Sequence, residues 1–219
     1  MTDLDRLSQN LKAVLERLER ENSSLKARGA VAATVRRAIA TESRAIFELV
    51  NAAYAVELGD KGLAFKKENR YLQESEVSAD IRKAEQDPAS SAFFCHVLAD
   101  QQTLAGVIRL VVRDDDTAAV DFGPFAVNPS CQGRGIGSKL LLVAEEWAQS
   151  KGCTSFKIEV VNHRIDLWDD SGQKPAGFYG RAGFHKVGEA PCDAEHNCDE
   201  SKVTRPSSFV LLARSLSYR

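Results

Sequence analysis

The feature that most constrains the fold is a glycine-rich segment, residues 132–137, with the sequence Gln-Gly-Arg-Gly-Ile-Gly. It follows a predicted strand over residues 118–127 and leads into a predicted helix over residues 135–150. Glycines at such a junction let the backbone approach a ligand without obstruction by a Cβ atom. The free amides of the first helical turn and the positive end of the helix dipole then form an anion site. The segment therefore predicts a ligand that carries phosphate, with Arg134 and Lys139 adding charge-assisted contacts.

The spacing of these glycines differs from that of the commonest nucleotide motifs. A P-loop requires a glycine, four residues and then Gly-Lys-Ser/Thr, and the residues from Gly137 onward do not supply this sequence. The dinucleotide fingerprint requires Gly-x-Gly-x-x-Gly in a βαβ unit, whereas here the glycines are at 133, 135 and 137 and follow a predicted hairpin. The remaining alternative is a glycine turn without a ligand. That alternative is disfavoured because three alternate glycines weaken the start of a helix unless they have a use.

Around this segment the chain alternates between strand-like and helix-like stretches. Strands are predicted over residues 32–39, 93–99, 104–112, 118–127, 155–161, 184–189 and 208–216, and helices over residues 41–56, 74–86, 135–150 and 176–182. Thr41 is expected to cap the first helix. The order predicts a mixed α/β fold (α+β), in which helices pack on a single sheet.

Residues 1–28 have a character of their own. Apolar side chains recur there at alternating steps of three and four, with Glu21 interrupting the series, at Leu4, Leu7, Leu11, Val14, Leu18 and Leu25. This heptad pattern predicts a helical arm over residues 1–28, and the rest of the chain, residues 29–219, is expected to form one domain. The arm is expected either to form a short coiled coil that joins two copies or to lie on its own domain.

Composition narrows the possible partners and the location. The net charge is −2, so no global field would attract nucleic acid or anionic lipid. The five cysteines are scattered and odd in number, which fits a reducing compartment. No signal peptide and no apolar run of about 18 residues is visible. We therefore expect no nucleic-acid or membrane partner and a cytoplasmic location, with the nucleus as the alternative. A homodimer through the N-terminal helix or a sheet edge is also considered.

Two motifs together resemble one family. The glycine segment follows a strand that ends Phe125-Ala126-Val127-Asn128-Pro129, and this unit is similar to the acetyl-CoA signature Gln-x-x-Gly-x-Gly of the GNAT acetyltransferase superfamily. Residues 177–184, Gly-Phe-Tyr-Gly-Arg-Ala-Gly-Phe, resemble the second block of that superfamily. The likeness spans roughly residues 30–216. It implies the GNAT fold: a mostly antiparallel, twisted sheet of six to seven strands flanked by about four helices, here with an N-terminal helix in addition.

The resemblance also implies a site for acetyl-CoA and no metal. The amides of residues 133–138 would hold the pyrophosphate. The strand over residues 125–127 would diverge from its neighbour and bind the pantetheine through its backbone, and an amide near Val127 would polarise the thioester carbonyl. The implied coenzyme-binding residues are Phe125, Ala126, Val127, Gln132, Gly133, Arg134, Gly135, Ile136, Gly137, Ser138, Lys139 and Asn162.

Acyl transfer to an amine needs a base and benefits from an acid. An alkylammonium, with a pKa near 10, must lose a proton, and the departing thiolate, with a pKa near 8.5, is helped by a donor. Tyr179 matches the position of the family's general acid, with a structural core tyrosine as the alternative. Asp121 lies where the histone-acetylating branch has a glutamate, and Glu159 on the next strand is the second candidate base. A solvated sheet face explains either carboxylate equally well.

The acceptor side is predicted from fewer residues. Tyr54 and Glu57 lie near the end of the first predicted helix, where they could meet a cationic amine. Arg164, in the long link over residues 163–175, could contact substrate or coenzyme, and an ion pair with Asp166 or Asp169 is the simpler alternative. The acidic loop over residues 192–200 contains Cys192, His196 and Cys198. Three potential ligands without a fourth at standard spacing do not predict a zinc site.

The function expected from these observations is N-acetylation of a primary amine on a small molecule, by direct attack within a ternary complex. One alternative is a protein or peptide N-acetyltransferase that acts on lysine or an N-terminus. The other is a non-catalytic acyl-CoA-binding or scaffold protein, in which the N-terminal heptads assemble partners.

Overall fold

The computed structural model describes residues 34–56, 70–71, 73–98, 103–161, 177–191 and 208–216. In chain order the elements are β1 (Thr34–Arg37), η1 (Ala40–Glu42), α2 (Ser43–Val56), α3 (Glu74–Gln86), β2 (Ser91–Val97), β3 (Leu104–Val112), β4 (Ala119–Val127), η2 (Pro129–Cys131), α4 (Ile136–Ser150), β5 (Ser155–Val161), α5 (Gly177–Arg181), β6 (His185–Pro191) and β7 (Ser208–Ser215). The predicted arm over residues 1–28 lies outside the described residues. No helix in the described ranges is both long and apolar enough to cross a membrane.

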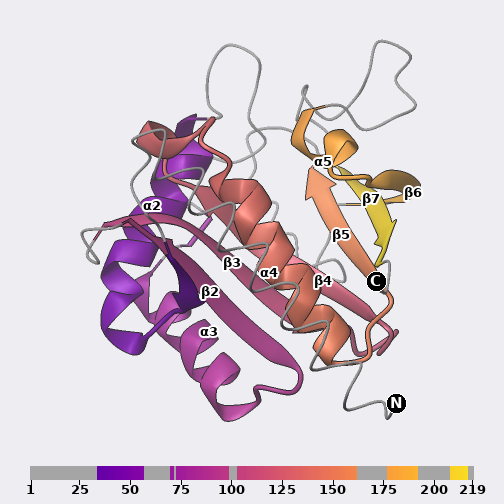
Figure 1. Cartoon of the computed structure of the whole chain (residues 1–219), viewed down its shortest axis with the longest axis horizontal. Helices are drawn as coiled ribbons and strands as arrows, with labels where there is room; N and C mark the ends of the chain where they lie inside the picture. The colour runs from indigo at the N-terminus through magenta and orange to yellow at the C-terminus, as the bar shows by residue number, and fades with distance from the viewer. Residues whose placement is uncertain are drawn as a thin grey trace, which may run out of the picture.

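One seven-stranded sheet forms the centre of the molecule, with the order β1-β2-β3-β4-β5-β7-β6 (Figure 1). All neighbouring pairs are antiparallel except β4 and β5, which are parallel. The sheet and the four described α-helices confirm the predicted mixed α+β class and the mostly antiparallel GNAT-type sheet.

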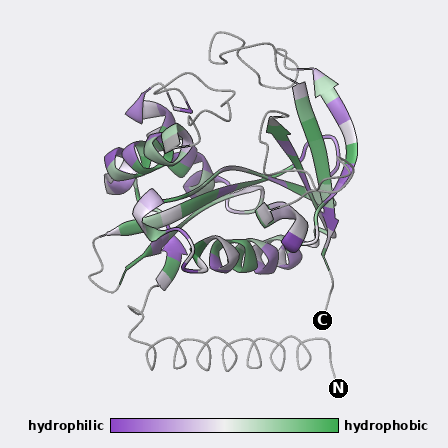
Figure 2. Ribbon diagram, turned by 90° about the horizontal axis from the view of Figure 1, so that it is seen from above, coloured by the Kyte–Doolittle hydropathy of each residue, from purple (hydrophilic) through white to green (hydrophobic). Residues whose placement is uncertain are grey.

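Helices cover both faces of the sheet, as Figure 2 shows, with α2 and α3 on one face and α4 on the other. Each face has its own apolar core. The α4-side core contains Leu110, Val120, Leu140 and Phe156, among others. The core under α2 and α3 contains residues such as Ile46, Val77, Phe93 and Val107. Apolar residues three and four apart along each helix produce these buried stripes.

The first helix corrects one detail of the prediction. Thr41 does not cap it, because Thr41 lies inside the 3-10 turn η1 and α2 begins at Ser43. The turn is closed instead by Glu42, whose carboxylate accepts a hydrogen bond from the Ile39 amide at 3.0 Å. The same carboxylate pairs with Arg36 at 2.6 Å. An acidic side chain reaching back to the start of the turn therefore replaces the expected hydroxyl cap.

A bulge divides β4 into two parts. Three residue steps from Phe122 to Phe125 lie opposite two steps from Leu110 to Ile108 on β3, so β4 carries one extra residue at Gly123-Pro124. Such a bulge bends a strand and redirects the side chains that follow it.

Beyond its first two residues, β4 has no pairing with β5 in the described part of the sheet. The two strands pair only at Ala119 with Ser155 and at Val120 with Phe156. From Asp121 to Val127, β4 continues to pair with β3, whereas β5 continues to pair with β7. The predicted divergence of this strand from its neighbour is confirmed, and it leaves one backbone edge of β4 facing a gap.

Candidate active site

The glycine segment adopts a backbone that explains two of its glycines. Gly133 and Gly135 have φ of +73° and +75°, in the left-handed region that side chains other than glycine's disfavour. A Cβ on either would meet no described atom within 4 Å, so conformation and not space requires glycine there. Gly135 is the residue directly before α4. The two turns bring the chain abruptly from the end of η2 into the helix.

Gly137 is glycine for a different reason. A Cβ at this position would lie 3.3 Å from the rings of both Phe125 on β4 and Phe178 on α5. The missing side chain therefore lets the first turn of α4 pack against two aromatic rings that come from separate elements. Those rings are 5.3 Å apart between centroids.

The amides of this segment are available to a ligand. Among the described residues, no backbone carbonyl accepts a hydrogen bond from the amides of residues 133–138, and the first such bond runs from the Lys139 amide to the Gly135 carbonyl at 3.1 Å. Gln132, Arg134 and Ser138 are exposed and Lys139 is partly exposed. Ile136 is buried and anchors the turn in the α4-side core. Free amides at the positive end of a 15-residue helix provide the donors for the predicted anion site.

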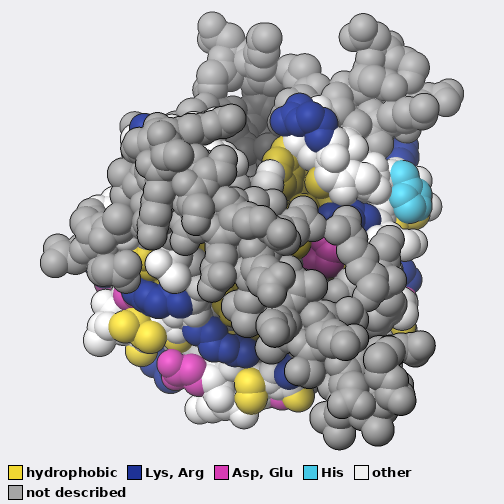
Figure 3. Space-filling model, in the orientation of Figure 1, with side chains coloured by type: hydrophobic (Ala, Val, Ile, Leu, Met, Phe, Trp, Pro, Cys, Tyr) yellow, Lys and Arg dark blue, Asp and Glu magenta, His cyan; other side chains and the backbone are white. Residues whose placement is uncertain are grey.

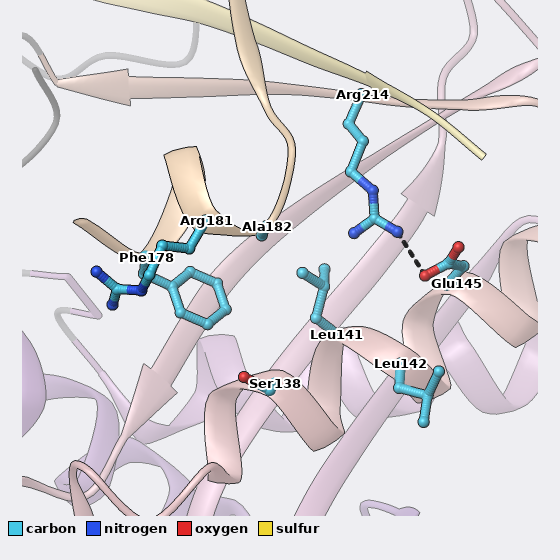
Figure 4. Close-up of a pocket in the computed structure, with 8 residues that line it drawn as sticks. All are labelled: Ser138, Leu141, Leu142, Glu145, Phe178, Arg181, Ala182 and Arg214. Carbon is cyan, nitrogen blue, oxygen red and sulfur yellow. Dashed lines mark hydrogen bonds and ion pairs between the residues drawn. The ribbon is translucent and has the colours of Figure 1, made fainter. Parts of the chain in front are cut away.

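A cavity of about 270 Å³ lies beside this segment, between α4 and α5. It is lined by Ser138, Leu141, Leu142, Glu145, Phe178, Arg181, Ala182 and Arg214. Figure 4 shows Phe178 of α5 near Ser138 at the start of α4, and Arg214 of β7 in an ion pair with Glu145 at 2.5 Å. In the space-filling view, hydrophobic side chains lie between basic ones in this recess (Figure 3). Among the described residues, no carboxylate forms an ion pair with Arg181, which adds positive charge that we did not predict.

Tyr179 is buried on the α4 side of the gap between β4 and β5. Its side chain is 8% exposed and belongs to the α4-side core. The ring stacks on Phe122 of β4 at 6.5 Å between centroids and meets the edges of Phe178 and Phe184 at 5.6 and 5.7 Å. These aromatic contacts fix the orientation of the phenol ring.

The two candidate bases lie together on the opposite face of the sheet. Asp121 alternates with Val120 and Phe122, and Glu159 alternates with Ile158 and Val160, all four of which face the α4-side core. Burial, with a smaller contribution from the Glu159 carboxylate, raises the pKa of Asp121 to about 6 against the opposing charges of Arg113 and Arg109. A carboxylate with a pKa close to neutrality is suited to accept a proton at physiological pH.

Comparison with known proteins decides the family. The sequence profile described as the acetyltransferase (GNAT) family matches residues 51–184, more than half of the chain. The chain belongs to the acetyltransferase (GNAT) family. This confirms the predicted superfamily and, with it, the enzyme class. The match begins in α2 and ends at Phe184, so it includes the glycine segment and Tyr179.

Solved structures agree in fold with this GNAT protein. YncA from Salmonella typhimurium, solved with its cofactor acetyl-CoA, is 17% identical with a TM-score of 0.60, over 85% of this chain and 95% of the other. The PaiA N-acetyltransferase from Thermoplasma acidophilum, in complex with coenzyme A, is 17% identical with a TM-score of 0.58, over 84% and 98%. An aminoglycoside 6'-N-acetyltransferase complexed with coenzyme A is 15% identical with a TM-score of 0.56, over 85% and 98%. At these identities the likeness shows the fold alone. No curated protein sequence matches the chain.

Some of the remaining predicted residues can be located in this GNAT domain, and others lie outside the described residues. Phe125 faces the α4 side, whereas Ala126 is buried under α2 and α3, and neither pairs with β5. Tyr54 is half-buried on α2, with the Arg70 guanidinium 6.0 Å from its ring centroid. Glu57, Asn162, Arg164 and the loop with Cys192, His196 and Cys198 lie outside the described residues. Within the described ranges, no group of three or more potential ligands is placed to hold a metal ion.

Sequence reasoning missed a polar network on the α2 and α3 side of β4. It joins Arg70, Tyr71, Asp80 of α3 and Arg109 of β3. The Asp80 carboxylate lies 3.0 Å from the Arg109 Nε and accepts a hydrogen bond from the Tyr71 hydroxyl at 2.8 Å. Arg109 also donates to the Gly123 carbonyl at the bulge, at 3.3 Å. The only signal for it in the sequence was an arginine within the otherwise apolar stretch Leu104–Val112.

Proposed function

We propose that this GNAT protein transfers the acetyl group of acetyl-CoA to a primary amine on a small molecule, by direct attack within a ternary complex. The observation that carries the proposal is the gap between β4 and β5. Free helix-start amides lie at one end of it, and two carboxylates lie on the sheet face opposite Tyr179. Acetyl-CoA supplies an activated acetyl group, and the protein must bind it, free the amine of a proton and protonate the thiolate.

The residues present fit the coenzyme. The free amides of residues 133–138 and the positive end of α4 match the charge of a pyrophosphate. Arg134 and Lys139 flank these amides, and Arg181 adds a second basic group from α5. The β4 edge from Asp121 to Val127, which has no β5 partner, offers backbone donors and acceptors to the amides of a pantetheine arm. We assign the same roles to Phe125, Ala126 and Val127 as the resemblance implied.

Asp121 is assigned as the group that receives the proton of the amine, with Glu159 on the same sheet face as the alternative. Because Asp121 has a pKa of about 6, it is mostly ionised at neutral pH and still basic enough to accept a proton. Glu159 contributes to the raised pKa of Asp121 and stays the second candidate base. Tyr179, held by rings on the other side of the gap, is assigned as the donor to the departing sulfur.

A thiol-release screen tests the proposal. Purified protein with acetyl-CoA is offered polyamines, amino acids, aminoglycosides and lysine-bearing peptides, and free coenzyme A is measured. We expect release with at least one class of small amine. Release with peptides alone would favour the protein or peptide acetyltransferase instead. If acetyl-CoA raises the melting temperature while no amine releases thiol, the protein binds acyl-CoA without catalysis.

We also propose that residues 1–28 form a helical arm joined to the catalytic domain of residues 29–219. The support is the heptad pattern of the sequence. Sedimentation of the full chain and of residues 29–219 separates the two possible roles. A dimer that becomes a monomer on truncation indicates a coiled coil, and an unchanged mass indicates an arm that lies on its own domain.

A further inference from the structure

An arginine lies over the bulge of β4, on the same sheet face as the candidate bases. At Gly123 the one described atom within 4 Å of an added Cβ is the Arg70 Nη2, at 3.9 Å. Arg70 packs over Tyr71, which belongs to the core under α2 and α3, so this face is the one opposite α4. Asp121 precedes Gly123 by two residues and faces the same side. The position without a side chain at Gly123 therefore lies beside the Arg70 guanidinium, on the face that carries Asp121.

Arg70 interacts with the charge of Asp80 and hydrogen-bonds the Tyr54 side chain, but it has no close ion pair with a described carboxylate. The nearest acid, Asp80, uses one carboxylate oxygen for Arg109 at 3.0 Å and the other for the Tyr71 hydroxyl at 2.8 Å. Arg70 itself lies over the rings of Tyr71 and Tyr54, at 5.6 and 6.0 Å from their centroids. Among the described residues, no carboxylate lies within ion-pair distance of its guanidinium. A half-buried arginine in this state retains donors for an anion.

Near the candidate bases, the same sheet face carries negative charge without a close ion pair. Arg113 interacts with the charges of both candidate bases, and it is engaged by Asp115 through two hydrogen bonds of 2.8 and 3.1 Å. Asp121 and Glu159 form no ion pair with any described residue, although each lies within electrostatic range of Arg113. This face therefore carries the carboxylates of Asp121 and Glu159 in one place and the guanidinium of Arg70 in another, none of them in an ion pair with a described residue.

We propose that the acetyl acceptor is a zwitterion, an amino acid or a close analogue of one. Its amine lies toward Asp121 and Glu159, and its carboxylate is bound by Arg70. This inference rests on the proposed function and narrows its substrate class. Alternate positions on a strand are roughly 7 Å apart, which matches the dimensions of an amino acid. Arginine is the side chain best suited to bind a planar carboxylate with two parallel hydrogen bonds.

Matched substrates test the proposal in the full-length protein. Thiol release is measured with pairs that differ only in the carboxylate, such as phenylalanine and phenethylamine, or lysine and cadaverine. We expect kcat/KM to favour the amino acid in the preferred pair by roughly 10- to 100-fold, the usual value of a hydrogen bond to a charged group. In Arg70→Gln this selectivity ratio should fall to about one, mainly through a higher KM for the amino acid. Arg70→Lys should retain part of it.

Arg44→Gln is the control, because Arg44 is an exposed arginine of α2 that pairs with Glu48. It should leave the selectivity ratio at the wild-type value. Melting temperature and acetyl-CoA affinity, measured for each variant, show whether the fold and the coenzyme site persist. Turnover of amines without preference for the carboxylate, or an equal loss for both members of a pair in Arg70→Gln, overturns this inference and leaves the proposed function intact. Failure to release thiol with any amine overturns both.

Discussion

The proposed coenzyme side and the proposed acceptor side of this site are built in different ways. The coenzyme side, residues 125–139 with α5, consists mainly of backbone: free amides, two glycines with positive φ and an unpaired strand edge. The acceptor side consists of charged side chains that come from α3, β3, β4, β5 and residues 70–71. A site made of backbone requires a contiguous, glycine-rich sequence, whereas a site made of side chains can be assembled from single residues far apart in the chain.

The largest effect is expected where the coenzyme side depends on backbone conformation. Gly135→Val should lower acetyl-CoA affinity by about 100-fold or more, because a β-branched residue resists the left-handed conformation that directs the amides. Titration calorimetry measures this affinity. Gly152→Val is the matched control, since Gly152 has φ of +78° at the other end of α4 and is equally open. Both variants should lose about 1–2 kcal/mol of stability. Equal affinities in the two would refute the role of the glycine segment.

On the acceptor side, Asp121→Asn should lower kcat by roughly 100-fold or more, as expected for the loss of a general base. The same variant should be more stable than the wild type at pH 8, by an amount on the order of 2 kcal/mol. Burial raises the pKa of Asp121 from 3.8 to about 6, so ionising it destabilises the folded state. The gain in stability should therefore be present above pH 6 and disappear as the pH falls from 6 to 4.

Glu159→Gln separates the two carboxylates. Without its neighbour, Asp121 should have a lower pKa, so the acid limb of the kcat/KM profile should move to lower pH. A larger loss of kcat in Glu159→Gln than in Asp121→Asn would instead make Glu159 the base. Chemical denaturation and pH-rate profiles provide the two measurements.

Tyr179→Phe tests whether Tyr179 donates a proton during the reaction in addition to packing in the aromatic cluster between the two sides. The ring contacts with Phe122 and Phe184 are retained, so the melting temperature should change little. The kcat for thiol release should fall by roughly 10- to 100-fold, because the donor to the sulfur is removed. Unchanged turnover would leave Tyr179 with a packing role only.

The smallest effect is expected beneath the coenzyme side, at His96 of β2. This side chain is 1% exposed, and within the described part of the chain neither ring nitrogen has a hydrogen-bond partner. His96→Leu should raise stability by about 1 kcal/mol near pH 7, since an unsatisfied buried polar group is removed. Burial, with the charge of Lys139, lowers the pKa of His96 to about 4. The wild type should therefore lose stability as the pH falls from 6.5 to 4, and the variant should lose less.

These differences explain what the sequence could and could not predict. The helix over residues 74–86 and the strand over residues 155–161 match exactly, because their apolar periodicity is local. The glycine segment proposed to bind the coenzyme could be picked out for the same reason, since Gly133 to Gly137 are consecutive. Arg70 and Asp80, by contrast, carry no pattern of their own, and only the packing of α3 against the sheet brings them together.

The sequence also could not predict that the two candidate bases interact with each other. Asp121 and Glu159 are 38 positions apart, and each alternates with apolar residues as an exposed charge on any sheet would. Their coupling follows from the parallel contact of Ala119 and Val120 with Ser155 and Phe156, a register that no local motif specifies.

The short parallel pairing of β4 with β5 has a consequence for the stability of the protein against unfolding and proteolysis. Among the described residues, strand pairing between β4 and β5, where the β1–β4 part of the sheet meets the β5–β7–β6 part, is limited to two residue pairs. A pantetheine arm bound along the open β4 edge would fill the gap. Acetyl-CoA would then stabilise the fold of the enzyme in addition to donating the acetyl group. At a concentration 100-fold above the dissociation constant, such a ligand adds about 2.7 kcal/mol to the free energy of unfolding. Resistance to proteolysis would then rise and fall with the concentration of acetyl-CoA, so the lifetime of the enzyme would depend on how much acetyl-CoA is present.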